Sequence, residues 1–197
     1  VNQDVRALAK RMNIRTGAVI INQCGEFGYE EYRHNSHTIR CYSLKERGVG
    51  LSRNSALMRA GGEIAVFSDE DIIYEDGYEE KIEKAFRQYE DADILLFNVK
   101  VAPARRTYWN EKAKRIHWYN YGRYPAYSIV ARTEALHRAN VSFSLLFGGG
   151  AKYSNGEDSL FLRDCLHKKL KIIALPEVIG EEKERESTWF HGYTDKF

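Results

Sequence analysis

The segment Ile64-Ala65-Val66-Phe67-Ser68-Asp69-Glu70-Asp71 decides how this 197-residue chain is organised. Four consecutive apolar residues predict a buried strand, and two carboxylates separated by one residue follow it closely. Mg²⁺ and Mn²⁺ prefer oxygen ligands, take only one or two carboxylates from a protein, and complete their coordination with substrate phosphates and water. The acidic tip therefore predicts a divalent cation with a phosphate-bearing ligand. The alternative interpretation is that these acidic residues only form a solvated turn after the strand.

Strands and helices are predicted to alternate on either side of this segment. Apolar runs predict strands at 18–21, 38–42, 64–67 and 94–99, and helical spacing predicts helices at 5–12, at about 52–59 and after Gly77. The alternation favours right-handed βαβ units, so we expect an α/β fold with a mostly parallel sheet covered by helices on both faces. Ligands bind such sheets at the carboxyl ends of the strands, where Asn22, Gln23 and the acidic tip converge.

The second half of the chain is less regular. Strands are predicted at 127–131 and 171–175, helices at 133–139 and 159–167, and a glycine-rich loop at 147–150. Basic and aromatic residues are mixed between 105 and 124. They would stack a sugar on Trp109 or Trp118 and attract an anionic acceptor through Arg105 and Arg106, or they would form a surface hairpin with aromatic cross-strand pairs. The sequence leaves both interpretations open.

The composition is that of one soluble globular domain. Hydrophobic residues make up 43% and charged residues 29% of the chain, and its length allows a sizeable core. The formal net charge of +2 gives no bulk attraction to nucleic acid, so no nucleic-acid partner is expected. Cys24, Cys41 and Cys165 lack the spacing of a zinc site and predict packed, reduced thiols in a cytosolic protein.

Four motifs, in this order, give the chain a resemblance to family 2 glycosyltransferases. They are Gly50-Leu51-Ser52-Arg53-Asn54-Ser55-Ala56-Leu57, Gly62-Glu63-Ile64, Phe67-Ser68-Asp69-Glu70-Asp71 and Gly156-Glu157-Asp158. The chain looks most similar to bacterial enzymes that build capsular and other cell-surface polysaccharides. The resemblance implies the GT-A fold and an inverting enzyme. Such an enzyme moves a sugar from a nucleoside-diphosphate sugar to a glycan or lipid-linked saccharide acceptor.

The resemblance also implies a domain organisation. Residues 1–197 would form one GT-A-like catalytic domain, with a donor half at about 1–100 and a less regular acceptor half at about 101–197. Most of a first strand before Asn2 and an extension after Phe197 would be missing, so the chain is expected to be a fragment. Relatives that use lipid-linked acceptors act at the inner face of the cell membrane. A cytoplasmic location with peripheral membrane contact is therefore expected.

Metal and diphosphate binding follow from the same resemblance. Asp71, the last acid of its motif, is the expected direct ligand of Mn²⁺ or Mg²⁺, and Asp69 is expected to face the ribose or the waters of the metal. Glu70 either points away or supports these two acids. His191 follows Ser187-Thr188-Trp189-Phe190 and is a candidate for a further metal or diphosphate contact, the alternative being a packed or solvated histidine.

Nucleotide contacts are implied at two places. Asn2, Gln3, Asn22 and Gln23 lie where the family's first two strands hold the nucleobase and ribose. Many relatives carry an aspartate there to recognise uracil, whereas amides both donate and accept hydrogen bonds. Uridine is still the expected base. Arg53 and Asn54 are expected at a helix N-terminus near the nucleotide, where backbone amides favour anions. A surface cation and a helix cap are the alternatives.

Asp158 is the candidate general base. Inverting transfer needs a carboxylate near the acceptor hydroxyl, on the side opposite the leaving group. Glu157 would hydrogen-bond the acceptor or the protein. A competing interpretation is that Asp158 is only the N-cap of the helix that follows it.

Two other functions stay open. A nucleotidyltransferase that forms sugar nucleotides would place a glycine-rich, basic phosphate loop after its first strand, and residues 2–12 contain no glycine. A non-catalytic carbohydrate-binding module would account for the aromatic segment at 105–124.

Overall fold

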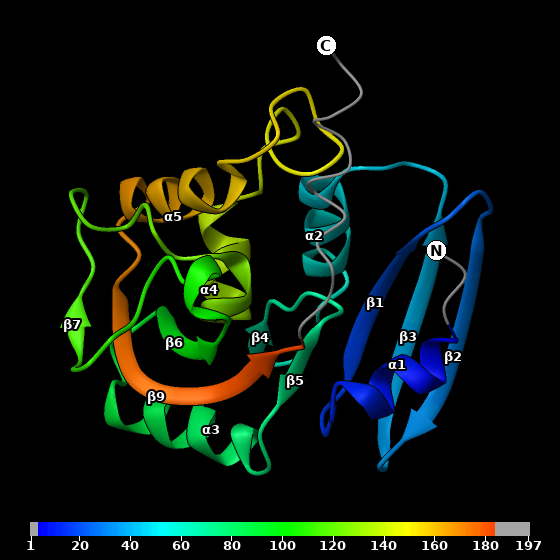
Figure 1. The fold of residues 1–197 in the computed structure, drawn as a ribbon, viewed down its shortest axis with the longest axis horizontal. Coiled ribbons are helices and arrows are strands. Elements are labelled where there is room, and N and C mark those ends of the chain that lie inside the picture. Colours follow the sequence, from blue (N-terminus) through cyan, green and yellow to red (C-terminus); the bar gives the residue numbers. More distant parts are fainter. Residues whose placement is uncertain (1–3, 184–197) are drawn as a thin grey trace.

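The computed structural model describes residues 4–183, which form two sheets with five α-helices packed on and around them and two short 3-10 helices, η1 (Pro103–Arg105) and η2 (Ala126–Ser128) (Figure 1). The first sheet has the order β1-β3-β2 and consists of β1 (Ala18–Gln23), β2 (Gly28–His34) and β3 (His37–Leu44). The second has the order β4-β8-β6-β9-β5, with β7 paired to β9. Its strands are β4 (Ile64–Val66), β5 (Ile72–Tyr74), β6 (Ile94–Lys100), β7 (Lys114–Arg115), β8 (Ile129–Arg132) and β9 (Ile172–Glu182). The helices are α1 (Val5–Arg11), α2 (Val49–Leu57), α3 (Tyr78–Gln88), α4 (Thr133–Ala139) and α5 (Glu157–His167).

The α/β class is confirmed, but the expectation of a mostly parallel sheet is wrong. Among the described pairs only β1 with β3 and β6 with β9 run parallel, and the other five are antiparallel. One cause is the hairpin of β2 and β3, in which Asn35 and Ser36 form a tight turn with φ of 48° and 66°. Most of β2 is exposed, so it lacks the apolar run by which the buried strands were predicted.

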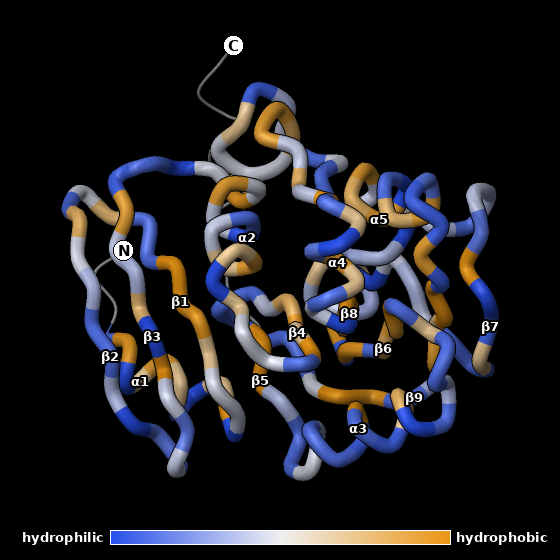
Figure 2. Tube along the Cα trace, turned by 180° about the vertical axis from the view of Figure 1, so that it is seen from behind, coloured by the Kyte–Doolittle hydropathy of each residue, from blue (hydrophilic) through white to orange (hydrophobic). Residues whose placement is uncertain are grey.

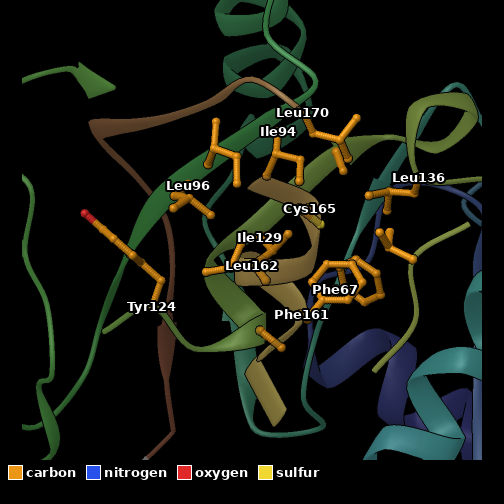
Figure 3. Close-up of a cluster of buried hydrophobic side chains, with 14 of the residues drawn as sticks. Phe67, Ile94, Leu96, Tyr124, Ile129, Leu136, Phe161, Leu162, Cys165 and Leu170 are labelled. Carbon is orange, nitrogen blue, oxygen red and sulfur yellow. The ribbon is translucent and has the colours of Figure 1, made fainter. Parts of the chain in front are cut away.

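The central strand β6 is buried on both faces. Ile94 and Leu96 belong to a cluster that includes residues of α4 and α5, and Figure 3 shows this cluster with Phe161, Leu162 and Cys165 of α5. Leu95 and Phe97 belong to a second cluster with residues of α1 and α3. Alternate residues of a strand point to opposite faces, which explains why a continuous apolar run is needed here.

The structure contains one strand that is longer than predicted and three strands that were not predicted. The last strand was predicted to end at residue 175, yet β9 continues through Pro176 to Glu182 along the sheet and pairs with β5 at its far end. The strands β2, β5 and β7 were not predicted, because the first is polar and the other two span only three and two residues. Tertiary pairing rather than local pattern therefore defines these strands.

Two further observations concern the helices and the cysteines of the described residues. No helix within residues 4–183 has the length and apolar character needed to cross a membrane. The three cysteines are free thiols, with Cys41 and Cys165 buried, in agreement with the packed thiols that were predicted.

Candidate functional site

Arg53 joins three acidic side chains that are far apart in the sequence. Its side chain lies in the middle of α2 and is only 10% exposed. Nη1 donates to Oδ1 of Asp158 at 2.6 Å and to Oε1 of Glu157 at 3.4 Å, and Nη2 donates to Oδ1 of Asp69 at 3.0 Å. One guanidinium therefore connects the acidic tip beyond β4 with the first turn of α5. Figure 1 shows α2 beside the loop that leads into α5.

An aromatic cluster of Phe67, Phe143 and Phe161 packs against this guanidinium. The Arg53 Cζ lies 5.3 Å from the centroid of the Phe143 ring, which stacks on Phe161 of α5 at 4.1 Å. Phe67, two residues before Asp69, packs edge-on against both rings. The residues that precede or follow the acids are thus core residues, and their packing fixes where the acids lie.

Both carboxylate oxygens of Asp158 are held in place. Oδ1 accepts from Arg53, and Oδ2 accepts from the backbone N–H of Ala126 at 2.9 Å. Gly156 is the N-cap of α5, so the N-cap interpretation of Asp158 is wrong. Burial raises the pKa of Asp158 to about 6, with Arg53 acting in the opposite direction. A half-buried carboxylate with this pKa suits proton transfer near neutral pH.

Charge at this rim is unbalanced toward the negative. Burial lowers the pKa of Arg53, but Asp69 and Asp158 raise it, and the net shift is upward, so the guanidinium stays charged. One cation then faces the three carboxylates of Asp69, Glu157 and Asp158. The surplus of negative charge favours a further cation at the exposed end of the cluster, where the Asp69 side chain is 39% exposed.

Glu182 and Arg105 lie next to the acidic tip. Glu182 is at the end of β9, opposite Ile72, and its side chain is only 7% exposed while it pairs with Arg105 at 2.8 Å. Burial raises its pKa, and the charges of Asp71 and Asp69 raise it further against the effect of Arg105. Sequence reasoning missed Glu182 because the strand was predicted to end at residue 175. The acidic pair Glu181-Glu182 was the available signal.

The predicted nucleotide contacts separate into two groups. Asn22, Gln23, Arg53, Asp69 and Glu70 all line one cavity of about 1600 Å³. Asn54 does not line it. Its amide donates to the carbonyl of Phe143 at 2.9 Å and accepts from the N–H of Phe143 at 2.7 Å. Asn54 therefore ties α2 to the segment under the rim.

The expectation that Arg53 and Asn54 begin a helix is wrong. The N-cap of α2 is Gly48, and the helix starts at Val49. Gln23 holds this cap: its amide donates to the Gly48 carbonyl at 2.9 Å and accepts from the Gly48 N–H at 3.3 Å. Gly50 lies in the first turn of this helix. A Cβ at residue 50 would lie 2.3 Å from the carbonyl oxygen of Ser144, so the close packing of α2 against that segment requires glycine.

The aromatic segment at 105–124 is partly core. Tyr108 and Tyr124 are buried and pack on each other with centroids 5.1 Å apart. The strand β7 within this segment pairs with β9, so the hairpin interpretation is wrong for these residues. Trp109 is 38% and Trp118 is 80% exposed. The use of Trp109 or Trp118 as a sugar platform stays a prediction.

A divalent cation at the acidic tip stays a prediction. Within the described part of the chain no group of three or more His, Cys, Asp or Glu side chains is arranged to hold a metal ion. Mg²⁺, however, commonly takes one or two carboxylates and completes its shell with substrate phosphates, and Asp69 with Asp71 offers that set. Asn2, Gln3 and His191, the other predicted contacts, lie outside the described residues.

Comparisons with known proteins point to one family. A family model described as Glycosyl transferase family 2 matches residues 28–147. No curated protein sequence matches the chain. Among solved structures, S. aureus TarS 1-349 in complex with UDP-GlcNAc is similar with a TM-score of 0.63 and 20% identity, over 86% of this chain and 50% of that one. A second structure of S. aureus TarS has a TM-score of 0.64 and 16% identity, over 91% of this chain and 33% of that one. The chain thus spans a third to a half of these structures, and at such identities the likeness shows the GT-A fold.

Proposed function

Because the chain belongs to glycosyl transferase family 2, we propose that it transfers a sugar from a nucleoside-diphosphate sugar to a glycan or lipid-linked saccharide, with inversion at the anomeric carbon. The observation that carries this proposal is the convergence of Asp69 and Asp158 on the guanidinium of Arg53. Donor-side and acceptor-side acids are thereby within one site. Two of the similar S. aureus TarS structures are complexes with UDP-GlcNAc and with UDP, which supports a UDP-sugar as the donor.

Asp158 is the proposed general base. It accepts the proton of the acceptor hydroxyl while that oxygen attacks the anomeric carbon. The new glycosidic bond forms as the bond from the anomeric carbon to the diphosphate oxygen breaks, and the nucleoside diphosphate leaves with the electron pair. Asp158 is largely ionised at pH 7 because its pKa is about 6. Arg53 and the Ala126 N–H hold its two oxygens in a fixed orientation.

The acidic tip is the proposed donor end. Asp71 and Asp69 would hold Mn²⁺ or Mg²⁺, which when bound supplies charge stabilisation for the departing diphosphate. Asn22 and Gln23 line the adjoining cavity and are proposed to contact the nucleoside. This arrangement supports the expected division into a donor half at about 1–100 and an acceptor half at about 101–197, with one exception. Arg105 and Glu182 come from the second half and lie at the donor end.

A binding experiment tests the donor end. Thermal-shift and calorimetric titrations with UDP and UDP-sugars, with and without Mn²⁺, should show binding that requires the metal. Asp71→Asn should abolish that requirement together with most of the affinity, because the proposed ligand is lost. Asp76→Asn is the matched control, since Asp76 is an exposed acid paired with Arg15 in another part of the chain.

Two outcomes would overturn the proposal. Equal binding of UDP to the unaltered protein and to Asp71→Asn, with no effect of metal in either, would exclude the metal-assisted donor site. Release of pyrophosphate from a nucleoside triphosphate and a sugar phosphate would instead support the alternative function of a nucleotidyltransferase that forms sugar nucleotides.

A further inference from the structure

Gln23 uses both ends of its amide on one backbone position outside its own strand. It is the last residue of β1, and its side chain donates to the Gly48 carbonyl and accepts from the Gly48 N–H. Gly48 is the N-cap of α2 and has a φ of 136°, a conformation that favours glycine. Glycine has no side chain with which to fix a helix cap. The hydrogen bonds from the neighbouring sheet therefore hold this cap in place.

The capped end of α2 in turn contacts the loop that leads into α5. We call residues 147–153 the glycine loop, and Figure 1 and Figure 2 show it from opposite sides above α2. The Val49 N–H donates to the Gly149 carbonyl at 2.9 Å. Gly150 packs on the cap itself, where a Cβ added to Gly150 would lie 3.3 Å from both the Cα and the N of Gly48. Two successive residues at the start of α2 thus hold two successive residues of the loop.

The glycine loop is closed by contacts between its own ends. Phe147 and Tyr153 form an isolated β-bridge, and their rings stack with centroids 4.8 Å apart. The Gly148 N–H donates to the Tyr153 carbonyl at 2.8 Å, and the Tyr153 N–H donates to the Leu146 carbonyl at 2.9 Å. A closely packed loop of this kind transmits a displacement from one side to the other.

The other side of the glycine loop lies against Glu157. Gly148 is buried with a φ of 99°, and a Cβ there would lie 2.5 Å from Cγ1 of Val49 and 2.7 Å from Cδ of Glu157. The loop backbone therefore fills the space between α2 and the Glu157 carboxylate. Oε1 of Glu157 lies 3.4 Å from Nη1 of Arg53, which is long for a hydrogen bond, so Arg53 alone holds this carboxylate only weakly.

We propose that Gln23 is a positioning residue for the acceptor end of the site. It holds the Gly48 cap, the cap holds the glycine loop, and the loop fixes the Glu157 carboxylate next to the candidate base Asp158. This role rests on the proposed function, in which the acceptor binds at the α5 end. An amide oxygen accepts two hydrogen bonds and an amide nitrogen donates two, so contact of Gln23 with the nucleoside does not compete with this role.

NMR of the unliganded protein tests the positioning without any substrate. Gln23→Met keeps the length of the side chain but removes both hydrogen bonds to Gly48. We expect the Val49 amide to exchange with solvent at least about tenfold faster, because its bond to the glycine loop is released. The side-chain carboxyl resonance of Glu157, assigned by its loss in Glu157→Gln, should shift.

Two controls separate release of the loop from a general loss of stability. The Ile94 amide donates to the Lys171 carbonyl in the second sheet, and its exchange measures any loss of stability of the whole fold. Gln88→Met, at an exposed glutamine of α3, is the matched substitution and should change neither the Val49 exchange nor the Glu157 resonance.

A second variant displaces the glycine loop from its other side. Gly148→Ala places a methyl group against Val49 and Glu157 and leaves the bonds between Gln23 and Gly48 unaltered. The Glu157 resonance should shift in this variant as well. An unshifted resonance would show that the loop does not fix Glu157.

Turnover distinguishes positioning from nucleoside contact. The probe is UDP-GlcNAc, the ligand of one of the similar structures, with Mn²⁺ present. For Gln23→Met we expect kcat, measured as UDP release, to fall about tenfold, because a misplaced group beside the reacting atoms slows transfer. The Kd for UDP should change less than about threefold, because the effect lies in the transfer step.

Three results for Gln23→Met would overturn the proposal. They are Val49 exchange that rises no more than Ile94 exchange, an unchanged Glu157 resonance, and a loss of UDP affinity with an unchanged kcat. A lack of UDP-sugar turnover in the unaltered protein would instead count against the proposed function, and the NMR results would still decide whether Gln23 positions Glu157.

Discussion

The two acidic ends of the site, one on α5 and one beyond β4, differ in the exposure of their carboxylates and in the number of hydrogen bonds that these carboxylates accept from the protein. At the α5 end, the side chains of Asp158 and Glu157 are 21% and 12% exposed, and both oxygens of Asp158 have protein donors. At the β4 end, Asp69 is 39% exposed and pairs with Arg53 through one oxygen. The proposed base is therefore oriented by the protein through both of its oxygens, whereas Asp69 at the donor end is more exposed to a ligand. A base held in a fixed orientation suits proton transfer from a bound acceptor.

The largest expected effect comes from removing the base at the α5 end. Asp158→Asn keeps the shape of the side chain and a partner for the Ala126 N–H but cannot accept a proton. We expect kcat for UDP-sugar turnover, measured as UDP release, to fall about 10³-fold. Metal-dependent UDP binding should persist, because the β4 end is unaltered.

The control for this variant is Asp164→Asn on the same helix, an exposed acid paired with Arg163. Turnover of Asp158→Asn within tenfold of the unaltered protein would assign the base elsewhere and remove the contrast between the two ends.

The second-largest expected effect is a loss of stability when Asn54, which ties α2 to the Phe143 backbone, is replaced. Asn54→Ala removes both hydrogen bonds to the Phe143 backbone, so we expect a loss of about 2 kcal/mol in the free energy of unfolding. For a chain of this length that corresponds to a fall in Tm of about 4–8 °C, measured by calorimetry. Asn155→Ala, at an exposed loop position, should leave Tm unchanged.

The same variant distinguishes support from nucleotide contact. An unchanged Tm combined with weaker UDP binding would return Asn54 to the donor end, where sequence reasoning had placed it.

The smallest effect is a shift in pH dependence through Arg53, which links the ends. The base must be ionised, so kcat/KM should rise with pH through about 6 and then level off. Arg53 lowers the pKa of Asp158, and Arg53→Gln should therefore move the rising limb to higher pH by about one unit.

Arg53→Lys keeps the positive charge and should move the limb less than Arg53→Gln does. An identical pH profile in all three proteins would show that Arg53 does not act on the charge of the base. Recovery of Arg53→Gln above pH 8 would separate this effect from a loss of folding.

Most helices and buried strands were predictable because their patterns are local. The apolar stripe of α3 and the run of β6 appear within a dozen residues of sequence, and both lie where predicted. The strands β2, β5 and β7 were not predictable in this way, because a polar or very short strand is defined by its partner. The start of α2 was misplaced for a related reason: glycine is a poor helix former, and Gly50 lies in this helix because α2 packs too closely on Ser144 for a Cβ at residue 50.

The site shows the same division. Asp69, Asp158 and Arg53 were identified from motif order, and their roles in the reaction stay predictions. Their mutual contacts and the participation of Glu182 were not foreseeable, because these residues lie far apart along the chain and their distances depend on how β4, β9 and α5 pack.

Residue types and their local order were therefore enough to establish the α/β class, the acidic tip and the candidate base. Hydrophobic periodicity and short motifs act over a few residues, so they are readable in one dimension. The mixed sheet, the role of Arg53 as a bridge and the cavity lined by β1 and β4 arise from long-range contacts. Such contacts depend on which edges and buried faces meet after folding, and a single sequence carries no local signal for them.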